Sequence, residues 1–290
     1  MSMKETLATS WAQVQELIDS ALAEDMAFDD VTTKSLIPDD LEGRASIVVK
    51  ADGVLAGGEV ARTVFLHVDP SLRVATLVQD GEIVKEGDVV ATIEGRVASL
   101  LRAERTALNF LCHLSGIATA TAHYVEAVGG LKARISDTRK TAPGIRLLEK
   151  YAVHVGGGRS YRLHLGDGIL IKDNHLAALR SQGIGLKEAI ARARQNSDLQ
   201  VEVEVGSIEE AREALDAGAD IIMLDNMSVE EMRQVAEMAG GRALIEASGS
   251  VDLENVRSVA ETGVDIISTG AITHSAKALD LSLDIETPSP

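Results

Sequence analysis

The sequence is short of cysteine, of aromatic residues and of long apolar runs, and each shortage excludes a class of protein. The single cysteine, Cys112, excludes an internal disulfide and a metal site built from several cysteines, and it fits a reducing compartment. Aromatic residues form only 2% of the chain, so a core must be built from Ala, Val, Ile and Leu, which suits helices packed on a buried sheet. No stretch approaches the roughly 20 apolar residues that a membrane-spanning helix needs, so we expect no membrane partner.

Positive charge is also scarce. The chain carries 28 Lys and Arg residues against 45 Asp and Glu residues, a formal net charge of −17. The phosphates of a nucleic acid would be repelled by this balance, so we expect no nucleic-acid partner. Residues 1–25 have the apolar spacing of an amphipathic helix, and they lack the basic segment and apolar run of a signal peptide. We therefore expect a cytoplasmic protein.

The first third of the chain has the patterns of a mixed α and β region. With 290 residues, 45% of them hydrophobic, the chain can bury a sizeable core. Residues 43–57 and 73–97 alternate in polarity and turn at glycines, which predicts short antiparallel strands, and residues 81–95 are typical of a hairpin. Residues 99–128 carry apolar side chains at three- and four-residue steps, which predicts a helix.

From residue 133 onward, short apolar runs alternate with helical segments. Residues 208–218 and 229–240 begin with acidic first turns and end at glycine, as helices do. Apolar strands that alternate with helices indicate a parallel sheet buried on both faces. The region is too short for a complete eight-unit barrel of about 250 residues, so we expect an incomplete β/α barrel joined to the N-terminal α+β region. Its expected strands lie in residues 133–140, 151–158, 168–175, 199–207, 219–228, 242–250 and 264–271.

Charged and small residues stand at the ends of these strands, where barrel enzymes place their functional groups. The first half of the barrel supplies cations, and the second half supplies carboxylates and small residues. Arginine forks match carboxylates and phosphates, two carboxylates on adjacent strands suit Mg²⁺ or ribose hydroxyls, and the loops ASGS and STGA offer N–H groups to a phosphate. The strand-end residues are Thr138, Arg139, Lys140, Arg159, Arg162, Lys172, Glu204, Asp225, Asn226, Glu246, Ser248, Gly249, Thr269 and Gly270.

Several of these groups have a simpler alternative explanation. Arg139 and Lys140 would be solvated charge in a turn, and Glu204 and Asp225 would be helix N-caps. What favours function is that all the groups converge on one face of the predicted barrel. Together they predict a substrate with several carboxylates beside a phosphorylated sugar and its metal.

The chain resembles the quinolinate phosphoribosyltransferase family, also called carboxylating nicotinate-nucleotide pyrophosphorylase, over nearly its whole length. No single motif carries the resemblance, which rests on their common order and spacing. The motifs are ALAEDMAFDDVTT, ERTALNFLCHLSGIAT, DTRKTAPGIRLLEKYAVHVGGG, LIKDNH, VEVEV, MLDN and EASG.

The resemblance implies a reaction and a fold. Quinolinate and phosphoribosyl pyrophosphate would give nicotinate mononucleotide, pyrophosphate and CO₂ with Mg²⁺, as a step of NAD biosynthesis. The implied fold is an N-terminal α+β sandwich domain, residues 1–117, on which the tail 273–290 packs, and an incomplete β/α barrel, residues 118–272, that holds the active site. The implied assembly is a homodimer, or a higher oligomer, whose active site borrows Arg105 from the neighbouring subunit.

The resemblance also implies a role for each matching residue. The quinolinate carboxylates would be held by Arg139, Arg162 and Lys172, and the other substrate-binding residues would be Arg105, which reaches across the dimer, Thr138 and Tyr161. Lys140 would lie between the two substrates, and Glu204 and Asp225 would meet the ribose and the metal. Together, Lys140, Glu204 and Asp225 would form the catalytic set. The 5′-phosphate would lie at Ser248, Gly249, Ser250, Thr269 and Gly270.

Two positions depart from the family pattern. The family usually reads Asn-His-Arg where this chain has Ser160, Tyr161 and Arg162, so an imidazole is replaced by a neutral phenol. Ser250 stands where glycine is common, and it would be strained if that position required a positive φ. The change at Tyr161 leaves an alternative open, an altered-substrate or non-catalytic paralogue of the type associated with molybdate transport. A second alternative is a Schiff-base aldolase that uses Lys140 or Lys172.

Overall fold

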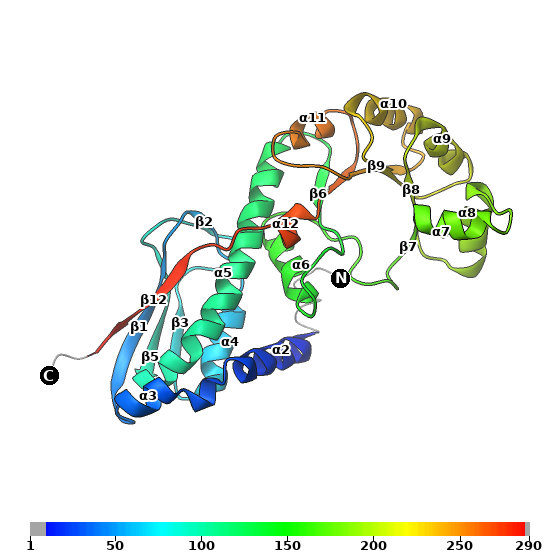
Figure 1. The fold of residues 1–290 in the computed structure, drawn as a ribbon. Coiled ribbons are helices and arrows are strands. Elements are labelled where there is room, and N and C mark those ends of the chain that lie inside the picture. Colours follow the sequence, from blue (N-terminus) through cyan, green and yellow to red (C-terminus); the bar gives the residue numbers. More distant parts are fainter. Residues whose placement is uncertain (1–9, 288–290) are drawn as a thin grey trace. The chain divides into compact units, whose positions relative to one another are not determined.

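The computed structural model describes residues 10–287, and these fold into two compact units (Figure 1). The first unit contains the residues up to 122, residues 141–157 and the residues from 275 onward. The second unit contains residues 123–140 and 158–274. Among the described residues, no helix is both long and apolar enough to cross a membrane.

The first unit is built on an antiparallel sheet of four strands. Its order is β12-β1-β5-β3, so the C-terminal strand pairs with β1. The inward side chains of β1 and β5, such as Ile47 and Ile93, are buried. The alternating pattern of residues 43–57 and 73–97 therefore predicted these strands correctly. Their bounds are β1 Glu42–Val49, β3 Arg73–Thr76, β5 Val89–Arg96 and β12 Leu281–Glu286.

The predicted hairpin over residues 81–95 is wrong. The turn forms, but strand β4 (Ile83–Val84) pairs with β2 (Gly53–Val54), whereas β5 pairs with β1 and β3. The physical reason lies in the backbone groups at the turn. Val49, at the end of β1, accepts a hydrogen bond from the Gly87 N–H and donates one to the Asp88 carbonyl, so β1 occupies the edge that β4 would need.

Helices cover the sheet of the first unit. The longest helix, α5 (Val97–Ala127), confirms the prediction for residues 99–128. Part of the amphipathic helix expected at residues 1–25 is confirmed as α2 (Trp11–Glu24), and residues 1–9 lie outside the described residues. The Asp30 side chain caps α3 by accepting hydrogen bonds from two backbone N–H groups at 3.0 Å. The other elements are η1 Ala27–Asp29, α3 Val31–Leu36, α4 Gly58–Val68 and α6 Arg146–Val155.

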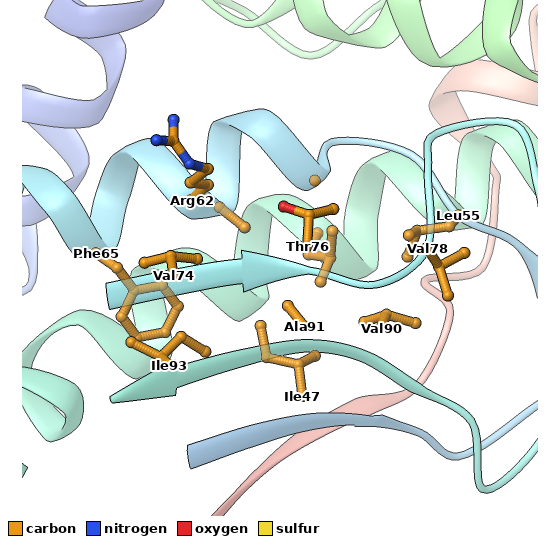
Figure 2. Close-up of a pocket in the computed structure, with 13 residues that line it drawn as sticks. Ile47, Leu55, Arg62, Phe65, Val74, Thr76, Val78, Val90, Ala91 and Ile93 are labelled. Atoms are coloured by element: carbon orange, nitrogen blue, oxygen red, sulfur yellow. The ribbon is translucent and has the colours of Figure 1, made fainter. Parts of the chain in front are cut away.

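A small gap between α4 and the sheet belongs to the core of the first unit. Figure 2 shows its apolar lining, which includes Ile47, Phe65, Val74 and Ile93. Its volume is about 20 Å³, little more than one water molecule occupies, and its walls offer a water few polar partners. The gap is therefore a packing void and not a ligand site.

The second unit is a curved parallel sheet whose order, β6-β11-β10-β9-β8-β7, places the first two strands of this unit, β6 and β7, at its two edges. Figure 1 shows α8, α9, α10 and α11 along the outer side of the curve. This is the predicted incomplete barrel. The strands are β6 Arg134–Ser136, β7 Ile169–Ile171, β8 Val201–Val205, β9 Ile221–Asp225, β10 Leu244–Ser248 and β11 Ile266–Ser268.

Two helices of the second unit, α9 and α10, begin and end where the sequence signals place them. α9 and α10 start at serine caps, and Gly240 ends α10 with a left-handed φ of 55°. The acidic first turns and terminal glycines therefore predicted these two helices correctly. The bounds are α7 Asp173–Arg180, α8 Leu186–Asn196, α9 Ile208–Asp216, α10 Val229–Ala239, α11 Val256–Ala260 and α12 Ala271–His274.

The strand predicted over residues 151–158 is wrong, because this run is the second half of α6 and the glycines that follow it. Leu147, Leu148, Tyr151 and Ala152 are all buried, which is a helical spacing. A single parallel bridge between Ser136 and Arg159 stands near the place where the strand was expected.

Candidate functional site

A cavity of about 690 Å³ opens within the second unit at the carboxyl ends of its strands. All six strands of the parallel sheet contribute side chains from their inner face, where residues at alternate positions point the same way. The cavity brings together most of the residues that the sequence singled out. Those in its wall are Thr138, Arg139, Lys140, Tyr161, Arg162, Lys172, Glu204, Asp225, Ser248, Gly249 and Ser250.

Four predicted residues lie outside this wall, and one of them, Arg159, forms the isolated bridge with Ser136. Thr269 follows β11 and is buried, with its hydroxyl donating to the Val251 carbonyl at 3.1 Å. Gly270 comes next and packs against the Lys140 side chain. Arg105 belongs to α5 in the first unit, where its side chain is 64% exposed and lies 4.0 Å from Glu104.

The loop after β6 sets the position of Lys140. The Thr138 hydroxyl accepts a hydrogen bond from the Lys140 N–H at 3.0 Å, and the Thr273 hydroxyl donates to the Lys140 carbonyl at 2.8 Å. A Cβ atom at Gly270 would lie 3.0 Å from Lys140 Cδ, so the glycine leaves room for the lysine stem. Lys140 is thus held between the β6 loop and the start of α12.

Lys172 and Glu204 form an ion pair at the boundary between the cationic and acidic halves of the cavity. Lys172 Nζ donates to Glu204 Oε2 at 2.6 Å. Lys172 also precedes α7, and its backbone N–H donates to His175 Nδ1 at 2.9 Å. His175 therefore closes the first turn of α7, which is a structural role.

Asp225 ends β9, and the Asn226 that follows it has a φ of 53°. The Asn226 side chain donates to Asp225 Oδ1 at 3.1 Å and accepts a hydrogen bond from the Ser250 N–H at 3.1 Å. Gly249 has a φ of 112°, and a Cβ atom there would lie only 2.3 Å from Asn226 Oδ1. The loop after β10 therefore requires glycine at this position.

The backbone of Ser250 is not strained, although glycine is common at this position in the family. Within residues 10–287, the only non-glycine residues with a positive φ are Met26 and Asn226. The positive φ of this loop falls on Gly249 instead, and the Ser250 hydroxyl gains a contact of 3.3 Å with Asn226 Oδ1.

Two buried glutamates lie deeper in the same cavity. Glu202 is 7% exposed and Glu246 is 5% exposed. Burial raises the pKa of Glu202 to about 8, and the neighbouring Glu246 carboxyl adds to the rise, while the Arg162 guanidinium opposes it. Burial likewise raises the pKa of Glu246. Because two buried carboxylates repel each other, the pair retains a proton near neutral pH.

The sequence offered a signal for Glu202 that our residue-by-residue prediction missed. In VEVEV, Glu202 and Glu204 are two positions apart on a strand, so both face the barrel interior. Glu246 was among the predicted strand-end residues but was assigned no individual role. Burying a carboxylate on the inner face of a buried strand costs free energy. A glutamate at such a position therefore suggested a functional role.

The acidic half of the cavity fits Mg²⁺ bound mainly through a substrate. Among the described residues, no group of three or more His, Cys, Asp or Glu side chains could hold a metal by itself. Mg²⁺ commonly binds proteins through one or two carboxylates together with substrate phosphates and water. Asp225 is the last residue of β9 and Glu204 the second-to-last residue of the adjacent β8, and they supply two such carboxylates.

Both parts of the chain match known protein families. Residues 30–115 match "Quinolinate phosphoribosyl transferase, N-terminal domain", and residues 117–284 match "Quinolinate phosphoribosyl transferase, C-terminal domain".

The chain is also similar to curated proteins and to a solved structure. It is 43% identical over 291 residues to the mitochondrial decarboxylating quinolinate phosphoribosyltransferase 2b of Nicotiana tabacum, which covers 94% of this chain and 82% of that protein. It is 43% identical over 277 residues to the carboxylating nicotinate-nucleotide pyrophosphorylase of Mycobacterium leprae, covering 93% and 96%. The crystal structure of NadC from Streptococcus pyogenes matches with a TM-score of 0.90 at 43% identity, covering 96% and 98%.

Proposed function

The chain belongs to the quinolinate phosphoribosyltransferase family, and from this premise we propose that it transfers the phosphoribosyl group of phosphoribosyl pyrophosphate to quinolinate with loss of CO₂. The product is nicotinate mononucleotide, a precursor of NAD. One observation carries the proposal: four cations and two strand-end carboxylates line a single cavity. The cations are Arg139, Lys140, Arg162 and Lys172, and the carboxylates are Glu204 and Asp225.

The cationic half suits the dicarboxylate. Quinolinate carries two adjacent carboxylates on a flat ring, and the guanidinium forks of Arg139 and Arg162 match carboxylates in geometry and charge. The ammonium of Lys172 adds a third cation, and Thr138 and Tyr161 offer hydroxyl groups in the same wall. In an acidic chain this concentration of positive charge selects an anion.

The acidic half and the glycine loop suit the phosphoribosyl donor. Glu204 and Asp225 are placed to accept hydrogen bonds from ribose hydroxyls and to hold Mg²⁺. Residues 248–250 line the cavity as a loop in which only glycine fits at position 249, and we assign the 5′-phosphate to this loop. Thr269 and Gly270 complete this end next to Lys140.

The phosphoribosyl transfer depends more on the relative position of the two substrates than on proton transfer. The pyridine nitrogen attacks the anomeric carbon of the ribose while the bond to pyrophosphate breaks, and pyrophosphate leaves with the electron pair. Holding both substrates in line supplies the proximity contribution. When bound, Mg²⁺ neutralises charge that develops on the departing pyrophosphate. We assign Lys140 a place between the two substrates, where its side chain would meet that same charge.

Decarboxylation follows on the quaternised ring. The bond between the ring and the 2-carboxylate breaks, CO₂ leaves, and the electron pair stays on the ring carbon, which then takes a proton. The positive ring nitrogen next to that carbon stabilises the electron pair. No general base is required, because the pyridine nitrogen carries no proton to remove. Arg139, Arg162 and Lys172 hold the ring while the bond breaks.

We further propose a homodimer, or a higher oligomer built from it, in which Arg105 reaches the neighbouring subunit's cavity. The exposed position of the Arg105 side chain supports this role. In the same unit, Met26, Phe28, Val31 and Leu36 are each more than half exposed, and a cluster of exposed apolar side chains suits an interface. A cytoplasmic location fits the single unpaired Cys112.

A calorimetric titration separates this function from the alternatives. Wild-type protein should bind quinolinate more tightly than nicotinate or molybdate, because the cavity matches two adjacent carboxylates. The variant Tyr161→His should keep this order and should bind quinolinate more tightly at pH 6, where imidazole gains charge. Tight binding of molybdate with weak binding of quinolinate would instead support the transport-associated paralogue.

The Schiff-base alternative has a separate test. Lys172 Nζ lies 2.6 Å from Glu204 Oε2, so this nitrogen is engaged with a carboxylate instead of standing free to attack a carbonyl carbon. Borohydride with a carbonyl substrate should therefore trap no adduct at Lys140 or Lys172. A covalent adduct at either lysine would support the aldolase.

A further inference from the structure

Asn226 connects two parts of the cavity to which the proposed function gives different roles. One is the Asp225 carboxylate, assigned to the ribose, and the other is the loop after β10, assigned to the 5′-phosphate. Its Nδ2 atom donates to Asp225 Oδ1 at 3.1 Å. Its Oδ1 atom accepts hydrogen bonds from the Ser250 N–H at 3.1 Å and from the Ser250 hydroxyl at 3.3 Å. One side chain thus joins the carboxylate at the end of β9 to the loop after β10.

The backbone conformation of Asn226 holds its side chain in this bridging position. Its N–H donates to the Ser248 carbonyl at 3.1 Å, and its φ of 53° is a left-handed conformation that asparagine tolerates better than most residues. A Cβ atom at Gly249 would lie 2.3 Å from Asn226 Oδ1 and 2.7 Å from Asn226 Cγ. The amide and the glycine are therefore packed in direct contact.

The loop is fixed from its other end as well. Asn255 Nδ2 donates to the Ser250 carbonyl at 2.9 Å, and Asn255 Oδ1 accepts a hydrogen bond from the Asp252 N–H at 3.1 Å. Ser250 is thus held on one side by Asn226 and on the other by Asn255. The β9–β10 pairing places Ser248 beside Asp225, and the Asn226 amide ties Asp225 to Ser250, farther along the loop.

Asp225 keeps one oxygen available under this arrangement. Within residues 10–287, Oδ1 takes the bond from Asn226, and Oδ2 makes no hydrogen bond or ion pair with protein groups. The amide therefore orients the carboxylate and leaves Oδ2 for a ligand. A ribose hydroxyl or a hard cation is the ligand that a carboxylate oxygen at this position suits.

We propose that Asn226 is a positioning residue, which fixes the Asp225 carboxylate and the loop of residues 248–252 at the separation that a ribose 5-phosphate group spans. This inference rests on the proposed function, because that function assigns the ribose to Asp225 and the phosphate to the loop. Asn226 does not touch the reacting atoms. It acts through Asp225 and through Ser250.

The decisive variant is Asn226→Gly. Glycine adopts a φ of 53° without strain, so this change removes the amide and leaves the backbone conformation accessible. The probe is ribose 5-phosphate, with quinolinate as the internal control, both titrated by calorimetry with Mg²⁺ present. We expect the dissociation constant of ribose 5-phosphate to rise about tenfold or more, and that of quinolinate to stay within about twofold.

A second variant, Ser250→Gly, should weaken the binding of ribose 5-phosphate less than Asn226→Gly does. Ser250→Gly removes the hydroxyl contact but keeps the N–H that donates to Asn226, so ribose 5-phosphate affinity should fall by about threefold or less. In turnover, Asn226→Gly should raise the KM for phosphoribosyl pyrophosphate and leave the KM for quinolinate unchanged. A purely structural role would change both ligands together and lower the unfolding midpoint.

Two outcomes would overturn the inference. One is that Asn226→Gly binds ribose 5-phosphate within twofold of wild type. The other is that both ligands weaken equally while the unfolding midpoint falls. Because the titration needs no turnover, it is independent of the proposed reaction. A protein whose affinity for ribose 5-phosphate depends on Asn226 but which forms no nicotinate mononucleotide would overturn the reaction and leave the positioning role intact.

Discussion

Lys172 Nζ lies 2.6 Å from Glu204 Oε2, and this ion pair joins the cationic half of the cavity to its acidic half. The Lys172 side chain is 46% exposed and the Glu204 side chain only 14% exposed. The lysine therefore offers its remaining donors to the cavity while it neutralises the more buried carboxylate. A dicarboxylate bound in the cationic half and a phosphorylated ribose bound in the acidic half would both lie next to this ion pair.

Removing the Lys172 ammonium should weaken quinolinate binding. A charge-assisted hydrogen bond contributes about 1.5–3 kcal/mol, so Lys172→Met should raise the KM for quinolinate about tenfold to a hundredfold. Lys187→Met is the matched control, because it removes the same charge from an exposed position on α8. Steady-state kinetics should show no effect of the control. An unchanged quinolinate KM in Lys172→Met would remove Lys172 from the substrate site.

A methyl group at Gly249 should damage the phosphate end of the cavity. Its φ of 112° is strained for alanine, and the Cβ atom would lie 2.3 Å from Asn226 Oδ1. Gly249→Ala should cost about 1–3 kcal/mol in unfolding free energy and raise the KM for phosphoribosyl pyrophosphate about tenfold. Gly185→Ala is the control, since a Cβ there meets nothing within 4 Å. Equal kinetics for the two variants would contradict the assignment of this loop.

The stability of the first unit should depend on pH through Asp69. Burial by itself would raise the pKa of Asp69, but hydrogen bonds from Ser71, Ser99 and Arg96 outweigh it and lower the pKa well below its usual value. A lowered pKa means that the carboxylate stabilises the folded state above about pH 4, and that this contribution is lost as the pH falls toward the folded pKa.

The matching variant is Asp69→Asn, which keeps the shape and removes the charge. It should lower the unfolding free energy by about 1–3 kcal/mol at pH 7, because two serines and an arginine lose a charged acceptor. Chemical denaturation at pH 7 and at pH 3 should show the difference shrink at the lower pH. A difference that is the same at both pH values would show that the charge of Asp69 is not what stabilises the unit.

The positions of six strands of the parallel sheet and their strand-end residues could be predicted from the sequence because both follow from local signals. Apolar runs followed by Thr138–Lys140, Lys172, Glu204 or Asp225 give the inner face of a parallel sheet directly. Helix starts and stops were equally local, as the serine cap and Gly240 of α10 show.

Other features depend on partners that are distant in the sequence. Residues 151–158 contain Val153 and Val155 before three glycines, which is typical of a strand, yet buried contacts of Leu148 and Ala152 place them in α6. A short apolar run cannot be assigned by periodicity alone. The bridging role of Asn226 likewise depends on Ser250, which is 24 positions away in the sequence.

Mixing inactive variants tests the proposed contribution of Arg105 to a neighbouring subunit. Arg105→Ala and Arg139→Ala should each be inactive alone. If Arg105 serves the neighbour, a mixed dimer has one site that keeps both arginines, and random exchange of subunits should restore about a quarter of wild-type activity. Activity is measured after the two variants have been dissociated and reassociated together. If Arg105 serves its own subunit, mixing will restore nothing.

The central claim is the decarboxylating transfer itself, and one assay tests it most directly. Purified protein is incubated with Mg²⁺, phosphoribosyl pyrophosphate and quinolinate labelled in its 2-carboxylate. The account predicts that labelled CO₂ and nicotinate mononucleotide form in equal amounts, and that both vanish when phosphoribosyl pyrophosphate is omitted. Neither product at millimolar substrate, or nicotinate mononucleotide that retains the label, would contradict it.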